Sequence, residues 1–135
     1  MATLVSISLP WVAVMLGGAA GALARYWLTW LAQRYAGSSR LGTLGVNIVG
    51  SFALGLSAAW LLVAESNLVV RAFFELGFLG SFVTFATVML DWRALGLQQP
   101  WRGLMYVFIS IAFSVLALLA GAAIAHGNGA TGYGV

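Results

Sequence analysis

Long stretches without a charged residue constrain this chain more than any other feature. Leu41–Ala64 runs for 24 residues and Gly103–Ala125 for 23 residues without a charge. Pro10–Leu31 contains only Arg25, and a further apolar stretch ends at Asp91. A helix of roughly 20 apolar residues crosses the hydrocarbon of a bilayer. The chain is therefore predicted to be an all-α membrane protein with four transmembrane helices.

The composition of the chain agrees with this fold class. Of the 135 residues, 62% are hydrophobic and 7% are charged, whereas soluble domains carry about 25% charged residues. We expect a single four-helix domain over residues 1–135, with helices at about 10–33, 42–64, 69–91 and 101–125 and a flexible tail at 126–135. The chain contains no cysteine, which excludes disulfides and thiolate metal sites.

The positive charges are distributed unevenly between the predicted loops. Arg34, Arg40, Arg93 and Arg102 fall in the first and third loops, whereas Arg71 lies on the other side with both termini. In a membrane protein this pattern indicates topology and not nucleic-acid binding, because arginine excess marks the cytoplasmic side. The chain is therefore predicted to insert mainly with both termini outside.

The third apolar segment is interrupted at Gly77–Val88, where two glycines, a serine and two threonines lie among phenylalanines. Lipid offers no water to loosened backbone groups, so irregular backbone persists only where protein buries it or where it lines a wet path. The segment predicts a helix break between Gly80 and Thr84 and a route for an ion or another solute.

Helix 2 places Asn47 one turn from both Thr43 and Ser51, on one helix face. Polar side chains inside a membrane are candidates for function. They also hydrogen-bond neighbouring helices and so hold them together. Both interpretations of Asn47 stay open on the sequence alone.

Helix 4 carries Tyr106, Ser110 and Ser114 at spacings of four, which gives a strip of hydroxyls along one face. These hydroxyls either face a solute or bond back to the preceding turn, as serine in membrane helices often does. In helix 1, Arg25 either extends toward the interface or attracts anions into a vestibule. The ring edge of Phe85 either faces an anion or packs in the core.

The acidic residues narrow the choice of function. Glu65, Glu75 and Asp91 lie at or near the ends of apolar segments, which argues against a proton-coupled cation exporter. Because no nucleophile–base pair and no metal-ligand cluster is present, the chain is not expected to be an enzyme. A small dual-topology carrier of another solute and a membrane scaffold packed through small residues remain alternatives.

Four motifs in order give a family resemblance that covers nearly the whole chain. Gly17–Tyr26 is similar to GGxxGAxxRY, Gly42–Gly50 to GTLxxNxxG, and Gly77–Gly80 to the opening of GFLGGxTTFSTF. The hydroxyl spacing in helix 4 matches a polar track. In these features the chain resembles the CrcB/Fluc family of fluoride channels.

The resemblance implies a passive, fluoride-selective channel in the plasma (inner) membrane that reduces fluoride toxicity. It implies an antiparallel, dual-topology dimer with helix 3 broken mid-span. It also implies a structural sodium ion bound by backbone carbonyls, which are carried over to Gly80 and Val83. The positions implied for the fluoride path are Asn47, Thr84, Phe85, Tyr106, Ser110 and Ser114. The positions implied for the vestibule or its structure are Arg25 and Thr43.

The third motif departs from the family pattern. Its second glycine is Ser81, and aligning GFLG without gaps places the first pore aromatic at Phe85 and the second at Val88. Asp91 then matches an acidic family position, which supports this register. We treat Val88 as a degenerate pore position. With the arginine bias, it leads to the hypothesis that the chain pairs with an oppositely oriented paralogue, either as a conducting or as a non-conducting partner, instead of forming a homodimer.

Overall fold

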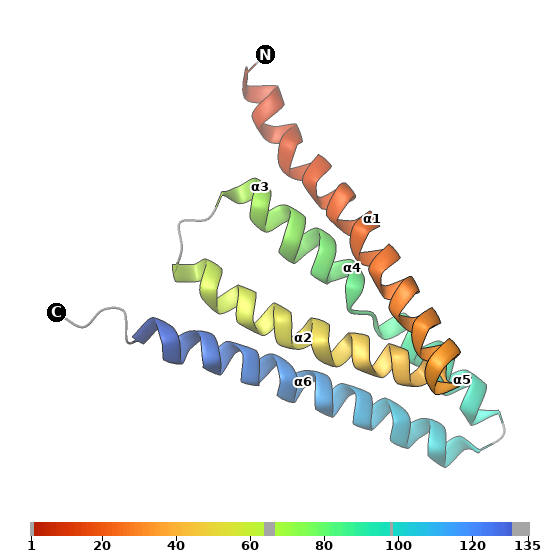
Figure 1. The fold of residues 1–135 in the computed structure, drawn as a ribbon. Helices are drawn as coiled ribbons and strands as arrows, with labels where there is room; N and C mark the ends of the chain where they lie inside the picture. The colour runs from red at the N-terminus through yellow and green to blue at the C-terminus, as the bar shows by residue number, and fades with distance from the viewer. Residues whose placement is uncertain (1, 64–66, 98, 131–135) are drawn as a thin grey trace.

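The computed structural model describes residues 2–63, 67–97 and 99–130 (Figure 1). Every element in these ranges is helical. The elements are α1 (Ala2–Ala36), α2 (Ser39–Val63), α3 (Leu68–Arg71), the π-helical η1 (Ala72–Leu79), α4 (Gly80–Phe82), α5 (Phe85–Gly96) and α6 (Pro100–Ala130). The all-helical class predicted from the sequence is confirmed for this part of the chain.

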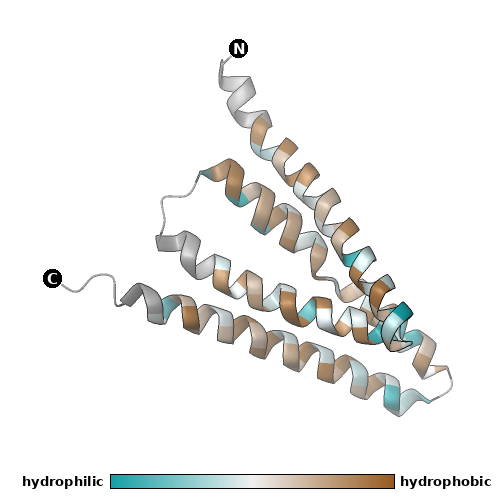
Figure 2. Ribbon diagram, in the orientation of Figure 1, coloured by the Kyte–Doolittle hydropathy of each residue, from teal (hydrophilic) through white to brown (hydrophobic). Residues whose placement is uncertain are grey.

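Two helix pairs organise the molecule. α2 and α6 lie side by side along their length, and α1 packs against η1 (Figure 1). The end of α1, the start of α2, α5 and the start of α6 come together at one end of the molecule. The more hydrophilic residues gather there, while the helix bodies are mostly apolar (Figure 2). Arg34, Arg40, Arg93 and Arg102 all belong to these helix ends, as the predicted topology requires.

Three helical stretches among the described residues are long and apolar enough to cross a membrane. They are Leu9–Ala36, Leu68–Gly96 and Pro100–Gly127. α2 is 25 residues long, but its side chains from residue 58 onward lie outside the described part, as does Glu65. A fourth spanning helix therefore stays a prediction.

The helix ends differ in detail from the expected boundaries. α1 begins at Ala2 and contains Pro10 in its interior, although the sequence places the first helical residue near this proline. α1 ends before Gly37, whose φ of +68° is readily adopted by glycine just after a helix. α6 continues to Ala130, so helix covers the first half of the tail predicted to be flexible, and residues 131–135 lie outside the description.

Glycines set the distance between paired helices. A Cβ atom on Gly17 or Gly21 of α1 would overlap a backbone carbonyl of η1. A Cβ atom on Gly55 of α2 would overlap the Leu118 carbonyl of α6. On α6, a Cβ on Gly121 would overlap the Phe52 carbonyl of α2. Small residues allow the backbones of neighbouring membrane helices to come into contact. Both helix pairs are therefore in backbone contact.

The elements from α3 to α5 form one rod, which is interrupted in its middle. α4 ends at Phe82, and the next two residues are extended, with φ/ψ of −77°/133° at Val83 and −147°/130° at Thr84. Helix resumes at Phe85. The extended residues fall within the segment for which the sequence predicts a break. Before the break the rod is π-helical over Ala72–Leu79, a feature that hydrophobic periodicity does not reveal.

Candidate functional site

A cavity of about 160 Å³ lies beside the break, between α2, α5 and α6. It brings together five of the six positions predicted for the path and four apolar neighbours. Its lining consists of Asn47, Val83, Thr84, Phe85, Val88, Ser110, Ile111, Ser114 and Val115. Residues far apart in the sequence thus meet at one site, where four polar side chains lie among apolar ones.

Two serine hydroxyls on α6 are available to this cavity. Within the described residues, neither Ser110 nor Ser114 donates a side-chain hydrogen bond, whereas Thr29 and Ser57 bond back to carbonyls of their own helices. Ser110 is only 2% exposed. Free hydroxyls can donate to an anion, and the back-bonding considered for these serines is not seen in the described residues.

Asn47 lines the cavity and holds the break. Its Nδ2 donates to the Thr84 carbonyl at 3.0 Å, and its Oδ1 accepts from the Thr84 amide at 2.9 Å. The side chain is 4% exposed. The structure thus shows Asn47 hydrogen-bonded to another element, which is one of the two interpretations left open by the sequence. Because Asn47 also lines the cavity, it lies next to any solute bound there.

The candidate aromatic positions of the third motif, Phe82, Phe85 and Val88, have different surroundings. Phe85 is 58% exposed and Val88 only 2% exposed, and both line the cavity. Phe82 is buried outside the cavity lining and stacks on Phe78, with 5.7 Å between ring centroids. The environment of Phe82 is that of a core side chain, which agrees with the register that places the path aromatic at Phe85.

Four predicted positions lie outside the lining of this cavity. The Tyr106 hydroxyl is within 3.1 Å of Asp91 Oδ2 and 3.2 Å of the Arg40 carbonyl. Thr43 is buried and donates to the Ser39 carbonyl at 3.3 Å. Arg25 is half-buried on α1 and Gly80 is exposed at the break. The hydroxyl strip of helix 4 is thus divided, with two serines at the cavity and the tyrosine at the polar end of the bundle.

The carbonyls of Gly80 and Val83, which the family resemblance implies as cation ligands, lie at the break. In a continuous helix the Gly80 carbonyl would accept from the Thr84 amide, but that amide bonds to Asn47 instead. Among the described residues, no hydrogen bond ends on the carbonyl oxygen of Gly80 or Val83. Oxygen ligands of this kind suit hard cations.

Sequence reasoning missed two features of the site. Ile111 and Val115 line the cavity, and each directly follows a predicted serine, so the spacing of four could have indicated them. Ser81, noted only as a departure from the family motif, donates to the Gly18 carbonyl at 2.8 Å. No sequence pattern pairs Ser81 with a helix 1 carbonyl, because that contact depends on how the helices pack.

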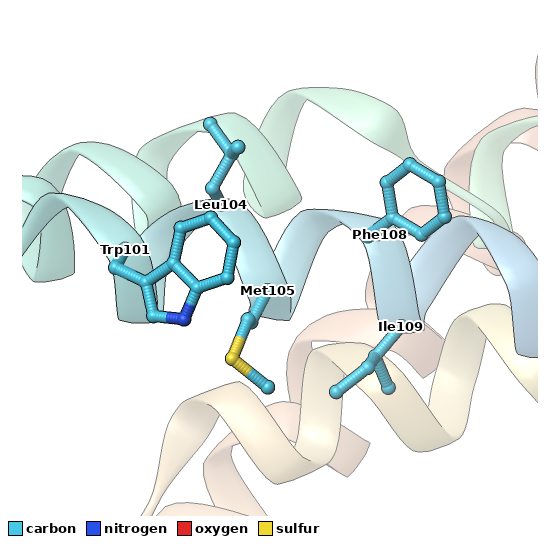
Figure 3. Close-up of a pocket in the computed structure, with 5 residues that line it drawn as sticks. All are labelled: Trp101, Leu104, Met105, Phe108 and Ile109. Atoms are coloured by element: carbon cyan, nitrogen blue, oxygen red, sulfur yellow. The ribbon is translucent and has the colours of Figure 1, made fainter.

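A larger groove on the outside of α6 is a poor candidate for an anion path. Its volume is about 380 Å³, and Figure 3 shows its residues along one helix. They are Trp101, Leu104, Met105, Phe108 and Ile109. These side chains offer almost no polar surface to replace the hydration of an ion. The cavity at the break, whose lining includes Asn47, Thr84 and two serines, is therefore the candidate site.

Long apolar helices with an interrupted rod beside a polar cavity define a multi-pass helical membrane protein. Residues 12–122 match the family model described as CrcB-like protein, Camphor Resistance (CrcB). The match covers most of the chain, which therefore belongs to the CrcB family.

Curated relatives agree with this assignment. The chain is 36% identical over 118 residues to a protein of Hahella chejuensis named fluoride-specific ion channel FluC, covering 84% of this chain and 91% of the relative. It is 40% identical over 115 residues to a protein of the same name from Paracoccus denitrificans, covering 84% and 92%. A third relative of this name, from Rhizobium meliloti, is 37% identical over 111 residues, with 80% and 89% covered.

Proposed function

We propose that this chain is a subunit of a fluoride channel that exports fluoride passively and so reduces its toxicity. The observation that carries the proposal is the cavity at the break, where the free hydroxyls of Ser110 and Ser114 meet Thr84 and Phe85. Fluoride is a small anion that needs hydrogen-bond donors when it loses its water. The names of the relatives point to the same ion.

Fluoride efflux from liposomes tests this function. Vesicles containing the purified chain should release fluoride, and Ser110→Ala should release it more slowly because one donor of the cavity is lost. Ser57→Ala is the matched control, since that hydroxyl bonds to the Leu54 carbonyl of its own helix. Equal rates for Ser110→Ala and the parent chain would remove Ser110 from the path. Transport of an organic cation instead of fluoride would favour a carrier.

The assembly that we propose is an antiparallel dimer of four-helix subunits in the inner membrane. Support comes from the face that carries the break, where Gly80 and Phe85 are exposed and a second copy could complete the path. In that arrangement α2 is the fourth spanning helix. Cross-linking of single-cysteine variants at Phe85, which is possible because the chain has no cysteine, should give covalent dimers in membranes. Only monomers after oxidation would contradict this assembly.

A structural sodium ion is part of the same proposal. The carbonyls of Gly80 and Val83 would hold it, since both lack a hydrogen-bond partner among the described residues. When bound, the cation would compensate carbonyl dipoles that the break leaves unpaired. Flux that is equal in sodium and in N-methylglucamine media, after exhaustive dialysis, would count against this site.

A heterodimer is the second candidate assembly. Two observations favour it. The first is the small Val88 at the second aromatic position, and the second is the gathering of four arginines at one end of the bundle. In such a pair this chain would insert with both termini outside and could serve as a non-conducting partner. A reporter fused to the C-terminus should then show one orientation, whereas equal populations would support a dual-topology homodimer.

A further inference from the structure

The backbone at the break is held by a single side chain from another helix. Asn47 makes two hydrogen bonds to one residue, accepting from the Thr84 amide at 2.9 Å and donating to its carbonyl at 3.0 Å. Because an amide N–H can only donate, the orientation of the Asn47 side-chain amide is fixed by this pairing. The side chain thus pairs with Thr84 as a neighbouring strand would.

These two bonds decide the backbone state of Thr84. Without a partner, the Thr84 amide would be an unsatisfied donor inside an apolar bundle, which is costly. In a continuous helix this amide would donate to the Gly80 carbonyl, the regular helical partner four residues earlier. Taking that bond would turn Val83 and Thr84 into helix and close the break. Asn47 therefore competes directly with the Gly80 carbonyl for one proton.

Packing from two sides supports the same state. On α1, the Gly18 carbonyl accepts from Ser81 Oγ at 2.8 Å. On α2, a Cβ on Gly50 would come within 2.5 Å of Val83 Cγ2 and 2.8 Å of Phe82 Cδ1. These contacts hold the residues that precede Thr84. Asn47, three residues before Gly50 on the same helix, supplies the only side-chain bonds that the structure describes to the Thr84 backbone.

We infer that Asn47 is a positioning residue, a backbone clamp that keeps the break open and so leaves the Gly80 carbonyl free. The clamp acts on Thr84 and through it on the carbonyls of Gly80 and Val83 and on the direction of Phe85. Its consequence for ion flux rests on the proposed function, but the clamp itself does not. A residue whose role is only to donate to the anion would leave the conformation of Thr84 unchanged when it is replaced.

The conformation of Thr84 gives the direct test. Carbon-13 Cα and Cβ chemical shifts of threonine-labelled protein differ in direction between extended and helical residues, and they can be read without ion flux. In the parent chain Thr84 should have extended shifts. In Asn47→Ala they should move to helical or averaged values. Ser51→Ala, one turn away and also buried, is the control and should leave them extended. Extended shifts in Asn47→Ala would overturn the clamp.

An aspartate at this position separates the two bonds and provides a second variant if the alanine variant does not fold. Asn47→Asp keeps an acceptor for the Thr84 amide but loses the donor to its carbonyl. We expect Thr84 to stay extended in this variant, while Asn47→Ala changes it. Helical shifts in Asn47→Asp, together with extended shifts in Asn47→Ala, would contradict the inference.

The sodium dependence of fluoride flux gives the functional readout. If the clamp frees the Gly80 carbonyl, Asn47→Ala should raise the sodium concentration for half-maximal flux on the order of tenfold, the scale set by one buried hydrogen bond. An unchanged sodium dependence with a lower maximal rate would support direct donation to the anion and count against the clamp. Absence of fluoride flux from the parent chain, both alone and together with an oppositely oriented paralogue, would reject the proposed function, while the chemical shifts would still decide on the clamp.

Discussion

The Tyr106 hydroxyl lies 3.1 Å from Asp91 Oδ2, which joins α6 to α5 near the arginine-rich end of the bundle. The Arg40 carbonyl lies at 3.2 Å from the same hydroxyl, but one proton serves one acceptor at a time. A bond to a carboxylate is the stronger of the two. Tyr106 is therefore committed to a contact between helices and does not line the cavity.

Removal of this hydroxyl should weaken the α5–α6 junction. We expect Tyr106→Phe to lower the free energy of unfolding by about 1–3 kcal/mol, because the carboxylate loses a charged hydrogen bond. Thermal unfolding of the detergent-solubilised protein measures the loss. In a double-mutant cycle with Asp91→Ala the two changes should not add. Full additivity would show that the two side chains do not interact.

Alanine substitutions at two adjacent glycines of α1 should have different effects on stability. A Cβ on Gly17 would overlap the Phe73 carbonyl, whereas one on Gly18 would meet nothing within 4 Å. We expect Gly17→Ala to cost about 1–3 kcal/mol of stability through overpacking and Gly18→Ala to change it by less than about 1 kcal/mol. Thermal melts of the two variants provide the comparison, and similar melting temperatures would argue against close α1–η1 packing.

An aromatic residue at position 88 should alter the cavity. Val88 is almost fully buried and lines the cavity of about 160 Å³. We expect Val88→Phe to fold with its ring in this space and to raise the ratio of fluoride to chloride flux, because a narrower path demands fuller loss of hydration. The control is Val49→Phe, since Val49 is exposed on α2 outside the cavity lining. Equal flux ratios in both variants would contradict the prediction.

The two members of the Arg71–Glu75 ion pair should not be equivalent. The pair is 3.4 Å apart, and the Glu75 side chain is 15% exposed whereas that of Arg71 is 40% exposed. Removing the cation leaves a largely buried carboxylate without its partner, so Arg71→Gln should cost about 2 kcal/mol. In Glu75→Gln the arginine can turn to the interface, and the change should stay within about 1 kcal/mol. A larger loss in Glu75→Gln, measured by thermal unfolding, would reverse this ranking.

The sequence predicts the helical rods and the position of the break because both depend on local composition. Uncharged runs identify the apolar helices, and the polar residues around Ser81 and Thr84 mark the interruption. The partner of each polar group depends on three-dimensional packing instead. Asn47 and Thr84 are 37 positions apart, and nothing in their spacing distinguishes a clamp from a free donor.

Helix boundaries and local helix type were also beyond the sequence pattern. Pro10 favours a helix start, yet α1 passes through it. A proline inside a helix lacks an amide donor and crowds the preceding turn, but membrane helices tolerate this. The π-helical turn pattern of Ala72–Leu79 lies where the rod contacts α1. Backbone overlap at Gly17 depends on that contact, which no single segment encodes.

The glycine contacts between helices have a mechanical consequence. Where Gly55 meets the Leu118 carbonyl and Gly121 meets that of Phe52, no side chain lies between the backbones to be compressed or rotated. The α2–α6 pair is therefore expected to be rigid, because sliding one helix along the other would make backbone atoms collide. Changes in the width of the neighbouring cavity are then expected on its α5 side, from side chains such as Phe85, and not from sliding of α2 along α6.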